Sequence, residues 1–285
     1  MIKFCAEIGS NHNQNIYRTI NLITEAKKIG CDSVKFQLFK GNQLYFYKFK
    51  QQISKMKKWE LPENFLPVIR TYCNNIDIEF GCSVFDLNGI NLAAQYCDWL
   101  KIGSYENKWK KLIVAVARTN KSWMISTGMD TESFKNLRKT LNLAWEENNI
   151  PQTIFHCCSN YPASPINCNL YKIKRLKKWY SNIKIGWSDH TTEKGIIYKA
   201  IALGATTIEF HFDMEDSIGY ESQISNSNHC WYPSDIADVI ENVRVGELAE
   251  QDNDTNETEA SKWRTDPEDG LRPLKEFRKE LLNGL

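Results

Sequence analysis

The chain has 285 residues, of which 42% are hydrophobic, so it is long and apolar enough to bury a sizeable core. Its formal net charge of +1 gives no overall field that would attract nucleic acid or a membrane surface, and we expect neither as a partner. No apolar run approaches the ~20 residues of a membrane span, and no signal peptide opens the chain. Nine cysteines without a CxxC pair suit free thiols in a reducing compartment, which favours a cytoplasmic protein.

Apolar runs that predict strands alternate with amphipathic segments that predict helices from end to end. The predicted strands are 3–9, 33–39, 78–84, 99–104, 122–128, 152–160, 184–190 and 206–212. The predicted helices are 15–30, 63–76, 87–97, 108–120, 131–149, 169–180, 193–204 and 233–249. Strict alternation indicates a parallel sheet, and eight such units in about 250 residues favour closure into an α/β (β/α)8 TIM barrel. A doubly wound open sheet is the alternative, but the GxGxxG turn that it would need after the first strand is missing.

Two regions depart from this alternation. Residues 40–62 form a long insert after the second strand, for which packing on the barrel rim is favoured over a lid or a contact surface. Residues 250–261 are polar and acidic, which predicts a flexible linker. We therefore expect a single barrel domain over 1–249 and a short C-terminal tail over 262–285, where apolar residues and arginines return.

Two histidines are informative because they lie in neighbouring predicted strands. Alternate side chains of a strand share a face, so Ser188 and His190 point to one side and Trp187 points to the other. In the next strand, Glu209 and His211 share a face. Parallel strands side by side would aim both imidazoles into one space, and neutral imidazole is the commonest metal ligand. The pair predicts a divalent metal site at His190 and His211, although such a pair taken alone is more often structural.

Polar groups also recur near the carboxyl ends of several predicted strands, where a barrel forms its active site. Glu7 would supply proton transfer or hold a water molecule. Lysines surrounded by hydroxyl and amide groups suit the phosphate and carboxylate of a substrate better than they suit Schiff-base chemistry, which needs a desolvated amine. The candidates for this anion site are Lys35, Lys101, Ser104, Ser126, Asn160 and Ser188.

Seven runs of the chain match one known family in order and spacing. On these runs the chain resembles the sialic acid synthases (N-acetylneuraminate synthases), which are phosphoenolpyruvate-dependent sugar acid synthases. The runs are AEIGSNHN (6–13), VKFQ (34–37), KIGS (101–104), STGM (126–129), HCCSNYP (156–162), SDHT (188–191) and GATTIEFHF (204–212).

The resemblance implies a TIM barrel that joins phosphoenolpyruvate to an open-chain N-acyl amino sugar aldehyde. The product would be a nine-carbon 2-keto sugar acid, with phosphate released. His190 and His211 would bind Mn2+ or a similar divalent ion, which would polarise the aldehyde. Glu7 would position or deprotonate the attacking water, the candidates for the anion site would hold phosphoenolpyruvate, and Gln37 and Tyr161 would contact the sugar.

The chain departs from the family pattern in the half that binds the sugar. The family usually has Gly-Pro-Asp-His where this chain has Gly219 to Ser222, and Lys or Arg where it has Phe210. We expect the C-terminal antifreeze-like domain of the family, which lends an arginine to the sugar site of a partner subunit, to be lacking. Arg272 in the tail is our candidate to cap the sugar site instead. The family dimerises partly through that domain, so a homodimer is kept open.

Two other functions remain open at this point. An aldolase that uses pyruvate, with a metal or a Schiff base, would release no phosphate. A degenerate barrel retained for binding or scaffolding is the non-enzymatic alternative. The presence of Glu7, Lys35, His190 and His211 speaks against a scaffold, because buried charges without a function only cost stability.

Overall fold

The computed structural model describes residues 1–130, 134–216, 218–223 and 229–249. Eight parallel strands follow one another around a closed barrel, because β1 pairs with both β2 and β8. These strands are β1 (Lys3–Gly9), β2 (Ser33–Leu38), β3 (Glu79–Val84), β4 (Trp99–Ile102), β5 (Ser122–Ser126), β6 (Thr153–Cys157), β7 (Lys184–Asp189) and β8 (Thr207–Phe212).

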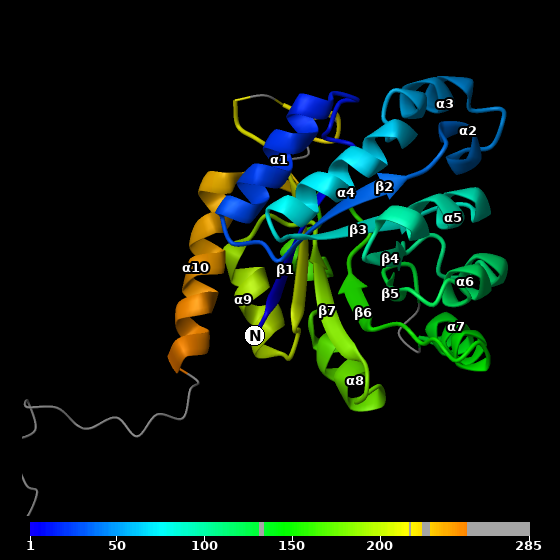
Figure 1. Cartoon of the computed structure of the whole chain (residues 1–285). Helices are drawn as coiled ribbons and strands as arrows, with labels where there is room; N and C mark the ends of the chain where they lie inside the picture. The colour runs from blue at the N-terminus through cyan, green and yellow to red at the C-terminus, as the bar shows by residue number, and fades with distance from the viewer. Residues whose placement is uncertain (131–133, 217, 224–228, 250–285) are drawn as a thin grey trace, which may run out of the picture. The chain divides into compact units, whose positions relative to one another are not determined.

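Helices follow the strands and lie around the outside of the barrel, as Figure 1 shows. They are α1 (Ile16–Lys28), α4 (Leu66–Asn75), α5 (Leu87–Tyr96), α6 (Lys110–Ala117), α7 (Lys135–Glu146), α8 (Tyr171–Trp179), α9 (Lys194–Ala202) and α10 (Pro233–Ala249). The (β/α)8 barrel predicted from the alternation of the sequence is confirmed, and the open sheet is excluded by the β1–β8 pairing. None of the helices in the described ranges is long and apolar enough to cross a membrane.

The barrel has two apolar layers. Between strands and helices, the outward strand side chains form one large cluster that includes Phe4, Phe80 and Trp187. A smaller cluster fills the interior of the barrel at its amino-terminal end and consists of Cys5, Trp99, Met124 and Phe155. Gly81 on β3 makes room for it, since a Cβ there would lie 2.2 Å from the indole of Trp99. This apolar floor leaves the other end of the interior for polar side chains.

Three local features differ from the sequence predictions. The insert over 40–62 contains two short helices, α2 (Gly41–Leu44) and α3 (Lys50–Lys57), before a 3-10 turn, η1 (Glu63–Phe65). The predicted strand over 152–160 ends at Cys157, because the chain turns there toward a second 3-10 turn, η2 (Pro165–Asn167). A ninth strand that the sequence pattern did not predict, β9 (Cys230–Trp231), pairs in parallel with the end of β8.

The barrel belongs to a compact unit that spans Met1–Val245. The predicted linker over 250–261 and the tail over 262–285 lie outside the described residues. The domain boundaries expected from the sequence therefore stay predictions.

Candidate active site

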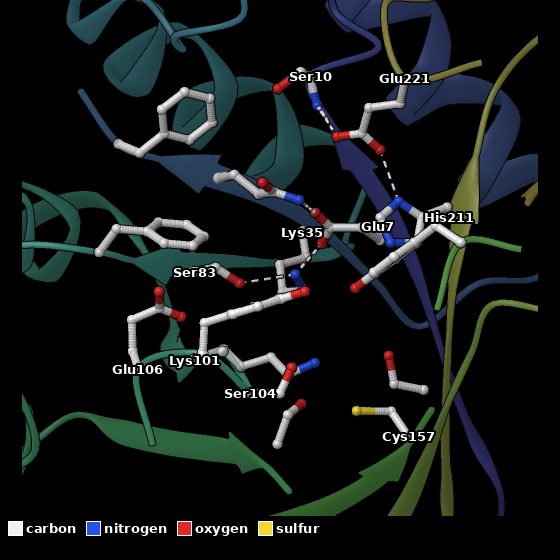
Figure 2. Close-up of a pocket in the computed structure, with 18 of the residues that line it drawn as sticks. Glu7, Ser10, Lys35, Ser83, Lys101, Ser104, Glu106, Cys157, His211 and Glu221 are labelled. Carbon is white, nitrogen blue, oxygen red and sulfur yellow. Dashed lines mark hydrogen bonds and ion pairs between the residues drawn. The ribbon is translucent and has the colours of Figure 1, made fainter. Parts of the chain in front are cut away.

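A cavity of about 660 Å3 opens at the carboxyl ends of the strands, and Figure 2 shows part of its lining. The strand register explains how residues distant in sequence meet there. Glu7 on β1 lies beside Lys35 on β2 and beside His211 on β8. Ten of the predicted site residues line this one cavity: Glu7, Lys35, Gln37, Lys101, Ser104, Ser126, Tyr161, Ser188, His190 and His211.

Two predicted site residues are not brought to the cavity. Asn160 lies beyond the end of β6, is exposed, and lines a separate hollow together with His156 and Lys172. Period-two alternation fails there because β6 has already ended. Arg272 lies outside the described residues, so its contact with the sugar site stays a prediction.

Two buried lysines at the centre of the cavity are held by two buried carboxylates. The ammonium group of Lys35 forms an ion pair with Glu7 and lies 3.8 Å from Oε2 of Glu209. The Nζ atom of Lys101 donates to Oε1 of Glu209 at 2.5 Å. The hydroxyl of Ser188 donates to the same Glu209 oxygen at 2.9 Å. Two positive and two negative groups therefore balance one another in a space from which water is largely excluded.

The ion pairs between these lysines and carboxylates influence which of the four groups are ionised. Burial works against ionisation of Glu209, but Lys101 and Lys35 outweigh it and hold the pKa of Glu209 at about 2. Burial also disfavours the charged form of Lys35, yet Glu209 and Glu7 raise its pKa above the usual value. For Glu7, burial is the largest effect and raises the pKa of the carboxyl, although Lys35 opposes it. Lys35 is thus held as an ammonium ion, which can donate to an anion.

The two predicted metal ligands lie on one side of the cavity, with ring centroids 5.3 Å apart. The Nδ1 atom of His190 donates to the carbonyl oxygen of Cys158 at 2.6 Å, and Nδ1 of His211 donates to Oε2 of Glu221 at 2.7 Å. In the neutral form of each ring, the proton on Nδ1 leaves Nε2 with its lone pair. Histidines that bind metals in proteins are commonly oriented by such a carbonyl or carboxylate partner. The donor set therefore fits a divalent ion.

Burial and the neighbouring His211 lower the pKa of His190 well below its usual range, so its imidazole is neutral. For His211, burial acts in the same direction, but the carboxylate of Glu221 outweighs it and raises the pKa. The two imidazoles therefore differ in charge preference although their rings are adjacent.

Glu221 is held by the turn that follows β1. Its Oε1 atom accepts the backbone N–H of Ser10 at 2.7 Å (Figure 2). Oδ1 of Asn11 accepts the backbone N–H of Glu221 at 2.9 Å. Gly9 makes this approach feasible, because its φ of +52° suits glycine and a Cβ at that position would lie 2.1 Å from Oε1 of Glu221. Glu221 is thereby fixed to the end of β1.

We expect Gly9→Ala to destabilise the protein and to disturb His211 through Glu221. The left-handed conformation alone costs a non-glycine residue about 1–2 kcal/mol, and the clash with the carboxylate adds to it. Thermal unfolding measures the effect on stability. Gly195→Ala is the matched control, since a Cβ there meets nothing within 4 Å and its φ is not positive. Equal melting temperatures for the two variants would contradict the role assigned to Gly9.

A carboxyl group that the sequence prediction missed also faces the cavity. Glu106 lies in the turn between β4 and α6, and burial raises the pKa of its carboxyl to about 7. Its Oε2 atom is buried and has no hydrogen-bond partner among the described residues. A carboxyl group that titrates near neutral pH and has an unused oxygen is suited to accept or donate a proton during a reaction.

The loop after β8 brings further donor groups to the histidines. The ring of His229 lies 4.9 Å from that of His211 and 5.3 Å from that of Tyr161, measured between centroids. Tyr161 in turn lies 4.1 Å from His190. His229 and Glu221 both line the cavity, although neither was among the predicted site residues.

Aromatic side chains form the outer wall of the cavity. Phe39 and Phe85 contact each other edge to face, with ring centroids 5.8 Å apart, and Tyr45 and Trp59 from the 40–62 insert line the cavity as well. The insert therefore contributes to the site in addition to packing on the barrel rim. Contact of this aromatic wall with the apolar face of a substrate would be more favourable than its contact with water.

Comparison with known proteins shows to which family the chain belongs. The model of the NeuB family matches residues 22–255, which is most of the chain. The chain belongs to the NeuB family. An uncharacterised protein of Methanocaldococcus jannaschii is 31% identical over 250 residues, covering 85% of this chain and 70% of that protein. The resemblance to sugar acid synthases stated from the motifs is thereby confirmed.

Relatives of the NeuB family with named activities support the same assignment. The N-acetylneuraminate-9-phosphate synthase of Drosophila melanogaster is 28% identical, over 74% of this chain and 60% of that protein. The N,N'-diacetyllegionaminic acid synthase of Legionella pneumophila is 28% identical, over 85% of this chain and 71% of that protein. The chain thus spans about two thirds of the length of these curated relatives. Their names share one class of product, a sugar acid.

Solved structures agree on the fold. The N-acetylneuraminic acid synthetase of Leptospira borgpetersenii superposes with a TM-score of 0.78 at 23% identity, covering 92% of this chain and 89% of that one. The spore coat polysaccharide biosynthesis protein SpsE of Bacillus subtilis gives a TM-score of 0.75 at 27% identity, covering 87% of this chain and 68% of that one.

Proposed function

We propose that this NeuB family protein condenses phosphoenolpyruvate with a sugar aldehyde and releases phosphate. The observation that carries the proposal is the pair of buried lysines, Lys35 and Lys101, at the centre of a cavity that also holds two neighbouring histidines. Ammonium groups and hydroxyls are donors for phosphate and carboxylate, and histidines with free Nε2 lone pairs are ligands for a cation. A scaffold would gain nothing from these buried charges.

Binding of the anion would rearrange the central ion pairs. The lysines lie among the hydroxyls of Ser104, Ser126 and Ser188, which line the same cavity. Phosphoenolpyruvate would accept from Lys35 and Lys101, and the substrate oxygens would compete with Glu7 and Glu209 for the ammonium groups. Because the lysines are already neutralised by these carboxylates, extra positive charge would favour binding. A divalent ion beside the histidines supplies such charge.

We propose His190 and His211 as ligands of that ion. When bound, it would act as a Lewis acid toward the carbonyl oxygen of the aldehyde. The histidine side of the cavity would then face the acceptor, and the lysine side would face phosphoenolpyruvate. The ring of Tyr161 packs beside His190, and Gln37 donates to Oε1 of Glu7 at 2.8 Å. We therefore propose that both side chains contact the acceptor.

The bond changes follow from this arrangement. C3 of phosphoenolpyruvate attacks the aldehyde carbon, and the aldehyde oxygen takes up a proton to become a hydroxyl. Water adds to C2 and loses one proton to a carboxylate, and the hydroxyl left on C2 then gives its proton to the departing phosphate as the C2 carbonyl forms and the C–O bond to phosphate breaks. Two carboxyls in the cavity can handle these protons, Glu7 on β1 and Glu106 after β4. Glu106 is the better candidate for a base, because its pKa lies near 7 and Glu7 is engaged by Lys35.

An N-acyl amino sugar of six carbons is the proposed acceptor, which gives a nine-carbon 2-keto acid. The names of the relatives support a sugar acid product, and the aromatic outer wall suits an acceptor with apolar substituents. A homodimer and a cytoplasmic location stay predictions.

The test is release of phosphate from phosphoenolpyruvate on addition of a panel of N-acyl hexosamines, with and without a chelator. We expect release that depends on one or a few acceptors, stops with the chelator and returns when a divalent metal is added back. Phosphate release with none of the acceptors would contradict the proposal.

We further expect that neither lysine forms a Schiff base. A Schiff base needs an amine that loses its proton readily, whereas Glu209 and Glu7 raise the pKa of Lys35. Borohydride treatment in the presence of pyruvate should therefore leave the mass of the intact chain unchanged. A reduced adduct on Lys35 or Lys101, located by peptide mass spectrometry, would assign the protein to the pyruvate aldolases instead.

A further inference from the structure

Four side chains of types that commonly bind metals lie close together around the start of β9. We call His211, Glu221, His229 and Cys230 the β9 cluster. One ligand atom from each lies within 4.8 Å of those of the other three, and the four residues are 8%, 5%, 4% and 2% exposed, respectively. Bonds of about 2.0–2.3 Å to a tetrahedral ion bring ligand atoms to roughly 3.3–3.8 Å from one another. Binding would draw the ligand atoms together by about one ångström and would release Oε2 of Glu221 from its hydrogen bond with Nδ1 of His211.

Backbone pairing sets this geometry. Cys230 lies opposite His211 in the parallel β8–β9 register, and Trp231 lies opposite Phe212. Partners in a parallel ladder share a face, so Cys230 points to the same side as His211, while Trp231 and Phe212 join the outer core. Glu221 is fixed separately by the backbone N–H of Ser10. Two independent anchors thus hold the donor groups together without an ion.

The β9 cluster also faces the substrate space. His211, Glu221 and His229 line the cavity, whereas Cys230 lies behind them. An ion held by these groups would therefore lie at the edge of the substrate space.

We propose that the β9 cluster is the principal site for a divalent ion of borderline or soft character, Zn2+ or Fe2+, with Cys230 bound as a thiolate. The inference rests on the cation site of the proposed function and names its ligands and its metal class. A thiolate favours Zn2+ or Fe2+ over the Mn2+ or Mg2+ expected for sites of imidazole, carboxylate and water. Binding replaces the thiol proton of Cys230, which leaves to solvent. His190, whose ring centroid lies 5.3 Å from that of His211, would add a further donor.

Cobalt is the probe, because Co2+ bound to a thiolate shows a sulfur-to-metal charge-transfer band that Co2+ bound to nitrogen and oxygen lacks. The full chain is stripped with a chelator and titrated with Co2+ in the absence of substrate. We expect one ion per chain and the charge-transfer band. Cys230→Ser should abolish the band and weaken Co2+ binding by at least about tenfold, and His229→Ala should weaken binding similarly. Cys168→Ser is the matched control, since this buried thiol contacts Ser164 away from the cluster and should change neither readout.

His190→Ala separates the β9 cluster from a site made of His190 and His211 alone. The β9 cluster should retain the cobalt band in this variant. Loss of Co2+ binding in His190→Ala together with unchanged binding in Cys230→Ser would overturn the inference. Should Cys230→Ser fail to fold, X-ray absorption on the cobalt-loaded wild type decides, since one sulfur at about 2.3 Å supports the site and nitrogen and oxygen alone contradict it.

The β9 cluster and the proposed synthase activity can be rejected independently of each other. Phosphate release that depends on a metal, together with a cobalt spectrum without a sulfur band, would leave the synthase proposal intact and reject the β9 cluster. A sulfur band without phosphate release for any acceptor would support the β9 cluster and reject the synthase proposal.

Discussion

Glu106→Gln is expected to lower turnover by about 10²–10⁴-fold while leaving the affinity for phosphoenolpyruvate nearly unchanged. The glutamine keeps the shape of the side chain but cannot accept a proton from the attacking water. Since burial raises the pKa of Glu106 to about 7, the carboxylate form that serves as the base is gained as the pH rises through neutrality. We therefore expect the rate of the wild type to rise over this range and the rise to disappear in the variant. Steady-state kinetics across pH measures both effects.

Stability gives a second readout that does not depend on substrate. A carboxyl whose pKa is higher in the folded than in the unfolded protein stabilises the fold at low pH and loses this contribution as the pH rises through the folded value. Glu106→Gln should thus raise the melting temperature at about pH 8 and change it little at about pH 5. Glu79→Gln on the surface is the control and should alter neither the rate nor its pH profile. A variant of Glu106 with normal turnover would remove this residue from the chemistry.

The barrel could be predicted from the sequence because its signal is repeated. Each strand is an apolar run followed by an amphipathic segment. An error in the bounds of one strand or helix therefore does not change the predicted number of strand–helix pairs. The same period-two rule placed Glu209 and His211 on one inner face, where the structure has them. It could not reveal that Glu209 pairs with Lys101, because that contact joins β4 and β8 across the barrel.

Glu106 and Glu221, which lie on loops, are not predicted from the sequence, for a physical reason. Glu106 lies in a turn without periodicity, so nothing in its neighbourhood indicates which way its carboxyl points. Glu221 reaches the site only because the N–H of Ser10, 211 positions earlier in the sequence, binds it. Asn160 lies outside the cavity because β6 ends at Cys157, before the end of the predicted strand over 152–160. For Glu221 the motif resemblance gives no guidance, because the chain departs from the family pattern in the loop after β8.

Lys35→Met is expected to cost about 3–5 kcal/mol of unfolding free energy, because it leaves the buried carboxylate of Glu7 without its cationic partner. Glu209 is less affected, since Lys101 still neutralises it. The KM for phosphoenolpyruvate should also rise by roughly 10- to 150-fold, the effect of losing one hydrogen bond to a charged group. Urea unfolding and steady-state kinetics measure the two effects separately. Lys3→Met is the control, because its ion pair with Glu79 is about half exposed and should contribute less than about 1 kcal/mol.

The double variant Lys35→Met with Glu7→Gln separates stability from function. Removing both members of a buried pair leaves no uncompensated charge, so most of the lost stability should return. Activity should not return, because the anion site still lacks the ammonium group of Lys35 and the site also lacks the carboxylate of Glu7. Recovery of stability and activity together would show that the Glu7–Lys35 pair serves only the fold. A double variant as unstable as Lys35→Met would show instead that the uncompensated charge of Glu7 is not what destabilises the single variant.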